Sequence, residues 1–337
     1  MILFQSAPPL SNATSGSGPR SESGALARTK RRPKNVHRGD RIFFGSLRAV
    51  SVALIALILG MFCLLLVQSI PTFQKFGWQF LTQTVWDPVR LEFGALPVIF
   101  GTLVSSAIGL VIAAPLSIGI ALFINEVAPK SVAAVVMFLV EMLAAIPSVV
   151  YGLWGILVLA PFCRDHLGPL LQNSLGFLPM FQGTPFGLGM LTAGIILAIM
   201  ITPTIASICR EVFRTIPVYQ REAALGLGAT RWEMMQLAIL KASRGGIVGA
   251  MTLGLGRAIG ETMAVTMVIG NRAQISASFF DPGQTMASVI ANEYAEASSD
   301  GHLSALVAIG VVLFAVTLII NLIAQRIVNK MQKNQAG

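Results

Sequence analysis

The sequence predicts an all-α integral membrane protein with six transmembrane helices, and two observations carry this prediction. Hydrophobic residues make up 54% of the chain and charged residues only 12%, whereas soluble globular proteins carry about 25% charge. The apolar residues also gather in six runs, each long enough to cross a bilayer as a helix. The mean hydropathy of +0.74 agrees with this class.

The six runs define one predicted transmembrane permease domain, residues 46–330. Their approximate bounds are 49–70, 95–124, 132–162, 188–208, 245–269 and 303–323. Pro147 and Pro203 fall inside two of the runs and predict kinks, because proline removes a helical hydrogen bond. Four hydroxyl side chains beside these prolines can satisfy the freed backbone groups or line a pathway: Ser148, Tyr151, Thr202 and Thr204.

Residues 1–45 predict a disordered, basic, cytoplasmic tail. Ser, Gly, Pro and Ala are frequent up to about residue 27, without an apolar period. The Lys and Arg residues that follow act as a topology signal before the first run. Binding of anionic membrane lipid, or of another partner, is a second interpretation of the tail, whereas nucleic acid is not expected as a partner.

The charge distribution predicts a multi-pass protein with both termini in the cytoplasm. With six spans and this orientation, 19 of the 24 Lys and Arg residues lie on the cytoplasmic side and 4 on the outer side. Such an excess is the usual signature of cytoplasmic segments. The remaining cation, Arg257, lies within the fifth run.

Arg257 and Glu261 form a charged pair inside this apolar run. Arg257 follows Gly245 by 12 residues, which places it about 18 Å along a helix and near mid-membrane. Glu261 is four residues further, so the two side chains are expected to share one helix face, which Gly256 and Gly260 leave bare. Charges at this depth indicate function; a structural ion pair that fixes helix register is the alternative.

Glu141 is a second candidate at depth. It follows Ser131 by ten residues, about 15 Å along the third predicted helix. It can partner Arg257 across the bundle, pair with a residue of another subunit, or serve packing alone.

The sequence predicts neither a metal site nor an enzyme. Its 3 cysteines and 3 histidines are dispersed, so no set of metal ligands can be written from them. It contains no GxxxxGK[ST] motif and no Gly-Lys pair, so the chain cannot bind ATP through a P-loop.

The segment 210–244 is the longest predicted cytoplasmic connection and has its own architecture. Pro217 can open a helix, and Gly226 and Gly228 can end it. Thr230 and Glu233 match a capping box. The segment therefore predicts a helix, a glycine turn and a second helix that leads into the fifth span.

The first of these helices suits docking onto another protein. Small Ala223 and Ala224 would seat closely in a groove, while Arg221 and Glu222 could pair with charges at its rim. An amphipathic helix resting on the lipid surface is the alternative.

Here the sequence resembles a known family. Glu222-Ala223-Ala224, followed after three residues by Gly228, resembles the EAA signature of membrane subunits of binding-protein-dependent ABC importers. Further on, Leu240 fits the family pattern, while Ala238 and Lys241 depart from it. The resemblance implies a type I ABC importer permease fold, in which this loop forms the cytoplasmic coupling helix. Docking on an ATPase subunit would then involve five residues: Arg221, Glu222, Ala223, Ala224 and Gly228.

Two longer strings, residues 141–152 and 256–262, resemble those of phosphate importer permeases. The resemblance covers about residues 45–330. It implies a bacterial inner (plasma) membrane protein that works with a second, homologous permease, two ATPase subunits and an external phosphate-binding protein. ATP and Mg would be used by the ATPase partner, with no cofactor in this chain.

The expected substrate pathway consists of four residues: Arg257, Glu261, Thr262 and Glu141. The guanidinium of Arg257 stays protonated when desolvated and can donate two parallel hydrogen bonds to a tetrahedral oxyanion. Glu261 would neutralise Arg257 in the empty pathway. It could also accept a proton from monohydrogen or dihydrogen phosphate, whereas sulfate carries no proton at neutral pH. An importer permease for another oxyanion such as sulfate, and a self-powered proton-coupled anion transporter or channel, are the alternative functions.

Overall fold

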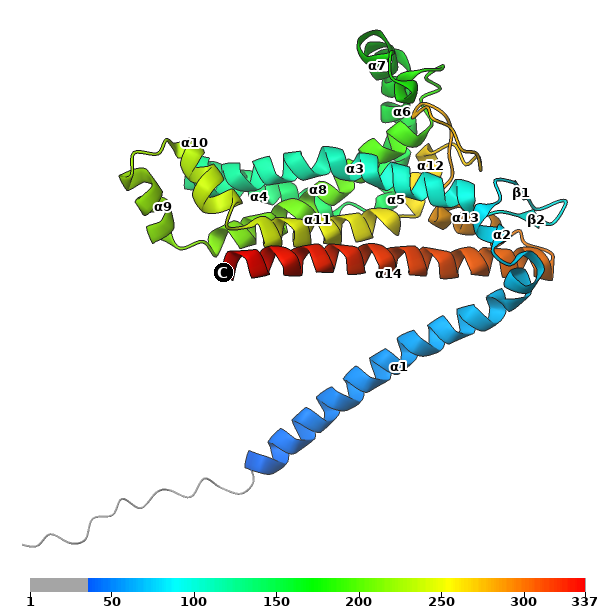
Figure 1. The fold of residues 1–337 in the computed structure, drawn as a ribbon, viewed down its shortest axis with the longest axis horizontal. Helices are drawn as coiled ribbons and strands as arrows, with labels where there is room; N and C mark the ends of the chain where they lie inside the picture. The colour runs from blue at the N-terminus through cyan, green and yellow to red at the C-terminus, as the bar shows by residue number, and fades with distance from the viewer. Residues whose placement is uncertain (1–35, 337) are drawn as a thin grey trace, which may run out of the picture. The chain divides into compact units, whose positions relative to one another are not determined.

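The computed structural model describes residues 36–336, and most of them are helical (Figure 1). This confirms the predicted all-α class. The predicted tail lies outside the described residues up to residue 35, but residues 36–45 are helical, contrary to the prediction. The helix of the first apolar run extends into the basic segment because arginine is a good helix former.

The described part of the chain divides into two compact units between Leu57 and Ile58. Each candidate site residue belongs to the second unit. Among the described residues, five helical stretches are long and apolar enough to cross a membrane: Gly39–Phe76, Leu96–Val127, Ser148–Leu175, Met190–Arg214 and Asp300–Met331.

The α-helices, in chain order, have these bounds: α1 (Val36–Phe76), α2 (Gln79–Thr82), α3 (Leu96–Leu122), α4 (Lys130–Ala145), α5 (Ser148–Trp154), α6 (Ala160–Phe162), α7 (Gly168–Leu175), α8 (Met190–Arg214), α9 (Val218–Gly226), α10 (Arg231–Met234), α11 (Arg244–Ile259), α12 (Met263–Val268), α13 (Met286–Glu293) and α14 (Asp300–Ala336). Four π-helical turns and one 3-10 turn connect some of them: η1 (Phe123–Val127), η2 (Gly155–Leu159), η3 (Cys163–Leu167), η5 (Met235–Leu240) and the 3-10 turn η4 (Pro179–Phe181). Two short antiparallel strands complete the described part: β1 (Trp86–Asp87) and β2 (Glu92–Phe93).

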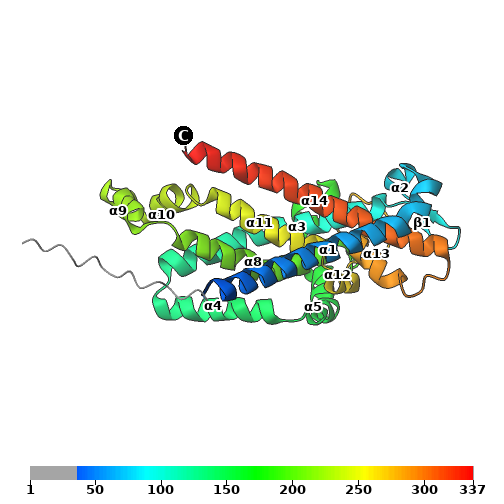
Figure 2. The same cartoon turned by 90° about the horizontal axis from the view of Figure 1, so that it is seen from below.

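The core of the second unit forms where α3, α8 and α11 lie side by side (Figures 1 and 2). Glycines allow this close approach. A Cβ at Gly109 would lie 2.9 Å from Cβ of Leu197, and one at Gly254 would lie 2.6 Å from Cγ1 of Ile205. Small residues at helix contacts are how membrane helices pack without a hydrophobic driving force.

Gly101 and Gly119, both in α3, give a matched test of this packing. A Cβ at Gly101 would overlap the backbone carbonyl of Gln284, whose carbon would lie at 3.0 Å, whereas a Cβ at Gly119 meets nothing within 4 Å. We expect Gly101→Ala to lower the thermal unfolding temperature of the purified chain. Gly119→Ala should raise it slightly, because alanine favours a helix over glycine by about 1 kcal/mol. Equal shifts of the same sign would contradict the packing of α3 against residue 284.

Two of the six predicted runs are not single helices. The run 132–162 is interrupted at Ile146–Pro147, between α4 and α5, and the run 245–269 is interrupted at Gly260–Thr262, between α11 and α12. Proline lacks the N–H that would continue α4. Backbone breaks at membrane depth are tolerated only where they are buried in protein or line a watery cavity.

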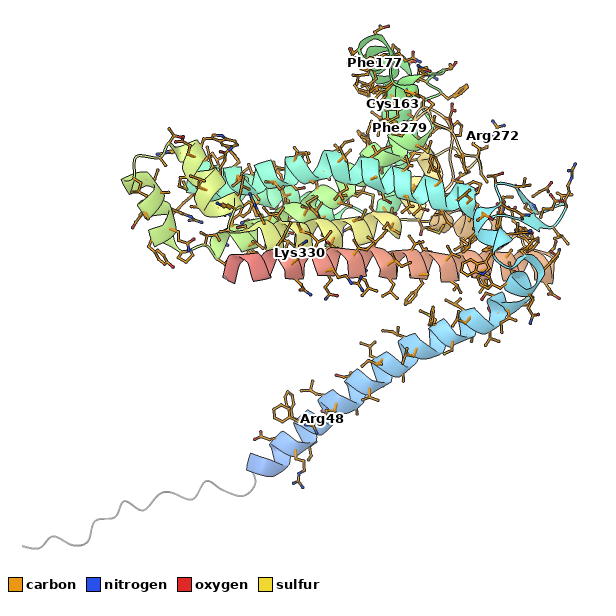
Figure 3. The ribbon with its side chains drawn as sticks, in the orientation of Figure 1. Arg48, Cys163, Phe177, Arg272, Phe279 and Lys330 are labelled. Carbon is orange, nitrogen blue, oxygen red and sulfur yellow. The ribbon has the colours of Figure 1, made fainter. Side chains whose placement is uncertain are left out.

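The segment after the first break turns away from the main bundle. Helices α6 and α7 project from α3, α8 and α11 (Figure 1), and Figure 3 shows Cys163, Phe177 and Phe279 in this projecting part. The backbone N–H of Phe279 donates to the carbonyl of Met180 at 2.9 Å, which ties the segment to the loop before α13. Residues 163–175, which follow the third predicted run, are helical because η3 and α7 continue from α6.

Candidate functional site

Arg257 lies near the end of α11 with its side chain exposed on the surface of the single chain. Its Nη1 donates to Oγ1 of Thr204, in α8, at 3.3 Å. The guanidinium also lies close enough to the Tyr151 phenol to act on it electrostatically. Thr204 is the one hydrogen-bond partner found for the Arg257 side chain within residues 36–336, so most of its N–H groups remain available to a ligand.

Glu261 does not pair with Arg257, contrary to the expectation. Helix α11 ends at Ile259, so the four-residue spacing no longer places both side chains on one helix face. Instead, Oε1 of Glu261 accepts a hydrogen bond from the backbone N–H of Ala264 at 3.3 Å, in the first turn of α12. No ion pair joins Arg257 to a carboxylate in the part of the chain that the structure describes. Among the described residues, Arg257 therefore has no carboxylate that compensates its positive charge.

Thr262 lies in the same break. Its hydroxyl donates to the carbonyl of Gly260 at 3.3 Å, and its own carbonyl accepts from the Thr266 hydroxyl at 2.7 Å. These contacts satisfy backbone groups that the interrupted helix leaves free. Thr262 thus stabilises the irregular backbone beside Arg257.

The other break is stabilised by Tyr151. The carbonyl of Leu143 would accept from the N–H of residue 147 in a continuous helix, but Pro147 has none. The Tyr151 hydroxyl donates to this carbonyl at 2.7 Å. The predicted role of this hydroxyl in satisfying a freed backbone group is confirmed.

Close packing of α5 on α12 brings the two breaks together. A Cβ at Gly152 would lie 3.1 Å from Cα of Ala264. The end of the string 141–152 therefore lies beside α12, which directly follows the string 256–262. Discontinuous helices of this kind mark binding sites in many transporters.

Glu141 lies elsewhere. It is exposed on α4 and lines a cavity together with Arg210, Arg214 and Arg221. No ion pair of Glu141 is found between residues 36 and 336. The structure does not join Glu141 to Arg257.

The segment 210–244 folds as a helix, a turn and a second helix. Gly228 in the turn has a φ of +86°, a left-handed conformation that favours glycine. The Thr230 hydroxyl accepts from the Glu233 N–H at 3.3 Å, and the Glu233 carboxylate accepts from the Thr230 N–H at 2.8 Å. The capping box is therefore confirmed. Hydrogen bonds from the backbone N–H and then the hydroxyl of Thr230 lower the pKa of the Glu233 carboxyl.

Arg221 on α9 contacts other residues of this chain. It does not extend from the outward face of α9, where it was expected to pair with charges at the rim of a groove in another protein. Its Nη2 lies 3.1 Å from Oε1 of Glu126 and donates to the carbonyl of Phe213 at 2.9 Å. The Arg221 and Glu126 side chains are only 22% and 8% exposed. Oε1 of Glu126 has no aligned hydrogen bond, so the contact is a close ion pair. Sequence reasoning missed Glu126, whose one signal is an acidic residue at the end of an apolar run.

The outward face of α9 presents the remaining docking candidates. Glu222 and Ala223 are exposed, whereas Ala224 packs against the core. Leu225 and Leu227 beside them are exposed too, Leu227 to 90%. Large apolar side chains exposed outside the membrane indicate a protein interface.

Sequence relatives of the chain are permeases. Residues 114–333 match the family described as "Binding-protein-dependent transport system inner membrane component". The chain is 45% identical over 275 residues to the phosphate transport system permease protein PstC of Haemophilus influenzae, covering 80% of this chain and 87% of that protein. It is 41% identical to PstC of Pasteurella multocida over 305 residues, 89% of this chain and 95% of that one. For PstC 2 of Mycobacterium tuberculosis the identity is 38% over 311 residues, 90% and 95% of the two chains.

Solved structures share the fold. A chain of a bacterial alginate ABC transporter, in complex with an alginate pentasaccharide-bound periplasmic protein, aligns with a TM-score of 0.59 at 17% identity, over 89% of this chain and 98% of that one. A chain of the inward-facing MetNI methionine ABC transporter aligns with a TM-score of 0.50 at 19% identity, over 75% and 96%. The type I ABC importer permease fold is therefore confirmed. On the sequence matches, the chain belongs to the PstC family of phosphate transport system permease proteins, within the binding-protein-dependent inner membrane components.

Proposed function

We propose that this chain is a transmembrane permease subunit of an ATP-driven phosphate importer. With a second, homologous permease it forms the pathway for inorganic phosphate into the cytoplasm. ATP and Mg are used by two ATPase subunits, and an external phosphate-binding protein delivers the ion. Both termini and α9 lie on the cytoplasmic side of the inner membrane, in line with the excess of Lys and Arg there.

The observation that carries this proposal is Arg257, which has no carboxylate partner among the described residues and lies beside the helix break at Gly260–Thr262. An anion at mid-membrane must exchange its hydration for a fixed positive partner. The exposed guanidinium keeps donors available beyond Thr204. The surface of the single chain on which Arg257 is exposed is the one that a second permease would cover. The guanidinium would then face a water-filled path between the two permeases rather than lipid.

The proposed coupling runs through α9. Its outward face docks on an ATPase subunit through Glu222, Ala223 and the neighbouring leucines, while Arg221 holds the helix to η1 and to the end of α8. Movement of the ATPases then acts on α3 and α8 directly, so that the Arg257 region opens to one side of the membrane and then to the other.

Uptake of labelled phosphate and labelled sulfate, in cells that lack their own importers for both ions, tests the substrate. We expect phosphate uptake that depends on expression of this chain with its partner subunits, and no sulfate uptake. Preferred sulfate uptake would overturn the phosphate assignment and leave the permease assignment standing.

Glu222→Lys is expected to lower retention of the ATPase subunit in a pull-down at least several-fold, because it reverses a charge at the proposed docking face. Retention of the second permease should be unchanged. Asn329→Lys introduces the same side chain at an exposed position of α14 and serves as the control. Full ATPase retention by Glu222→Lys would count against the docking role of α9.

A further inference from the structure

A cavity of about 620 Å³ lies between η1, α4, the last turns of α8 and α9. Six polar residues line it: Asn125, Lys130, Glu141, Arg210, Arg214 and Arg221. Four of them are cations and one is a carboxylate. The positive charge comes from three separate helices, so it is a property of the assembled cavity and not of one basic stretch.

Neighbouring acids neutralise this charge only in part. Glu126 engages Arg221 at 3.1 Å. Glu211 lies 3.4 Å from Arg210 and 3.5 Å from Arg214, but its side chain is 64% exposed. Because this largely exposed carboxylate is screened by solvent and shared by two arginines, it offsets little of their charge. Arg210, Arg214 and Lys130 therefore keep most of their attraction for a further anion.

Two of the arginines also have buried donors without acceptors. The Nε atoms of Arg210 and Arg221 are buried and make no hydrogen bond. An unsatisfied buried donor is destabilising, and such a group calls for a missing partner such as water or an ion. A tetrahedral oxyanion supplies several acceptors, and guanidinium groups match its geometry.

Glu141 sets which oxyanion fits. As the one carboxylate of the lining it repels a fully deprotonated anion, but it can accept a hydrogen bond from a protonated one. Monohydrogen phosphate keeps a P–OH donor at neutral pH, whereas sulfate has none. The same reasoning disfavours the phosphodiester of a lipid headgroup, which also lacks this proton.

We propose that this cavity is a second anion site, separate from Arg257, that binds hydrogen phosphate at the end of the molecule where α9 lies. The assignment of this cavity to the cytoplasmic side rests on the proposed function. The proposal that the cavity binds hydrogen phosphate does not depend on it. Because Arg221 belongs both to the cavity and to the attachment of α9, a bound phosphate contacts the coupling segment directly.

Binding of labelled inorganic phosphate to the purified full chain in phosphatidylcholine nanodiscs tests the site. The Arg257→Ala background removes the pathway residue, and saturable binding should persist there. Arg210→Gln should weaken this binding roughly tenfold or more, since hydrogen bonds to charged groups contribute about 1.5–3 kcal/mol. Arg214→Gln, at an exposed position, should weaken it in the same direction without risk to folding.

Arg231→Gln removes an exposed cation that does not line the cavity, and should leave binding unchanged. Glu141→Gln should raise competition by sulfate. Unchanged phosphate affinity in both Arg210→Gln and Arg214→Gln would overturn the site. Displacement of labelled phosphate by phosphatidylglycerol added to the nanodiscs would assign the cavity to lipid instead. Neither result bears on phosphate uptake, so the failure of this site and of the proposed function remain distinguishable.

Discussion

Arg257→Ala should lower phosphate uptake by the assembled transporter roughly 10- to 100-fold. The substitution removes the charged donors that replace water around the anion, and hydrogen bonds to charged groups contribute about 1.5–3 kcal/mol. The fold of the chain should be unaffected, because the side chain contacts only Thr204 by hydrogen bonding within residues 36–336. Uptake of labelled phosphate, normalised to the amount of complex recovered, measures the effect.

Two further variants sharpen this result. Arg257→Lys keeps the charge but loses the planar fork, so uptake should fall between those of the wild type and Arg257→Ala. Arg326→Ala removes an exposed cation of α14 and should transport normally. Wild-type uptake by Arg257→Ala would show that Arg257 serves helix register alone, the alternative that the sequence left open.

Arg221→Met should uncouple the ATPase from transport. The substitution leaves the buried Glu126 carboxylate without its ion-pair partner. Breaking a buried ion pair in this way lowers the free energy of unfolding by about 3–5 kcal/mol. Helix α9 then loses its attachment to η1 and to the end of α8. The outward face with Glu222 remains, so we expect ATPase binding in a pull-down to persist while ATP-dependent uptake is largely lost.

A double variant separates the ion pair from general damage. Replacing both charges, as in Arg221→Met with Glu126→Leu, should recover thermal stability, because two apolar partners of similar volume often substitute for a buried pair without loss. Arg214→Met, at a half-exposed pair, should change stability little. Normal coupling in Arg221→Met would contradict the role of this contact in transmission.

Features set by local sequence could be predicted. The capping box needs only Thr230 and Glu233 three residues apart, and the structure has both of its hydrogen bonds. The break at Pro147 follows from the missing N–H of proline. In both cases a single turn of backbone is enough for the outcome, although Pro203 lies inside α8 without interrupting it.

Features set by long-range packing could not be predicted from the sequence. The expected pairing of Arg257 with Glu261 assumed a continuous helix, and no proline marks its interruption at Gly260–Thr262. At this break α12 packs closely against Gly152 of α5. The residue spacing within one apolar run does not reveal this contact between distant segments. Glu126 and Arg221 likewise meet only because α9 folds back on η1.

Reconstitution tests the central claim most directly, namely that the chain conducts phosphate only when driven by an ATPase. Labelled phosphate is measured inside proteoliposomes that hold either the purified chain alone or the chain with the second permease, the ATPase subunits and the binding protein. We expect accumulation only in the complete system with ATP and Mg, and none in either preparation when a proton gradient is applied without ATP. Proton-coupled phosphate flux through the chain alone would contradict the account and identify a self-powered transporter.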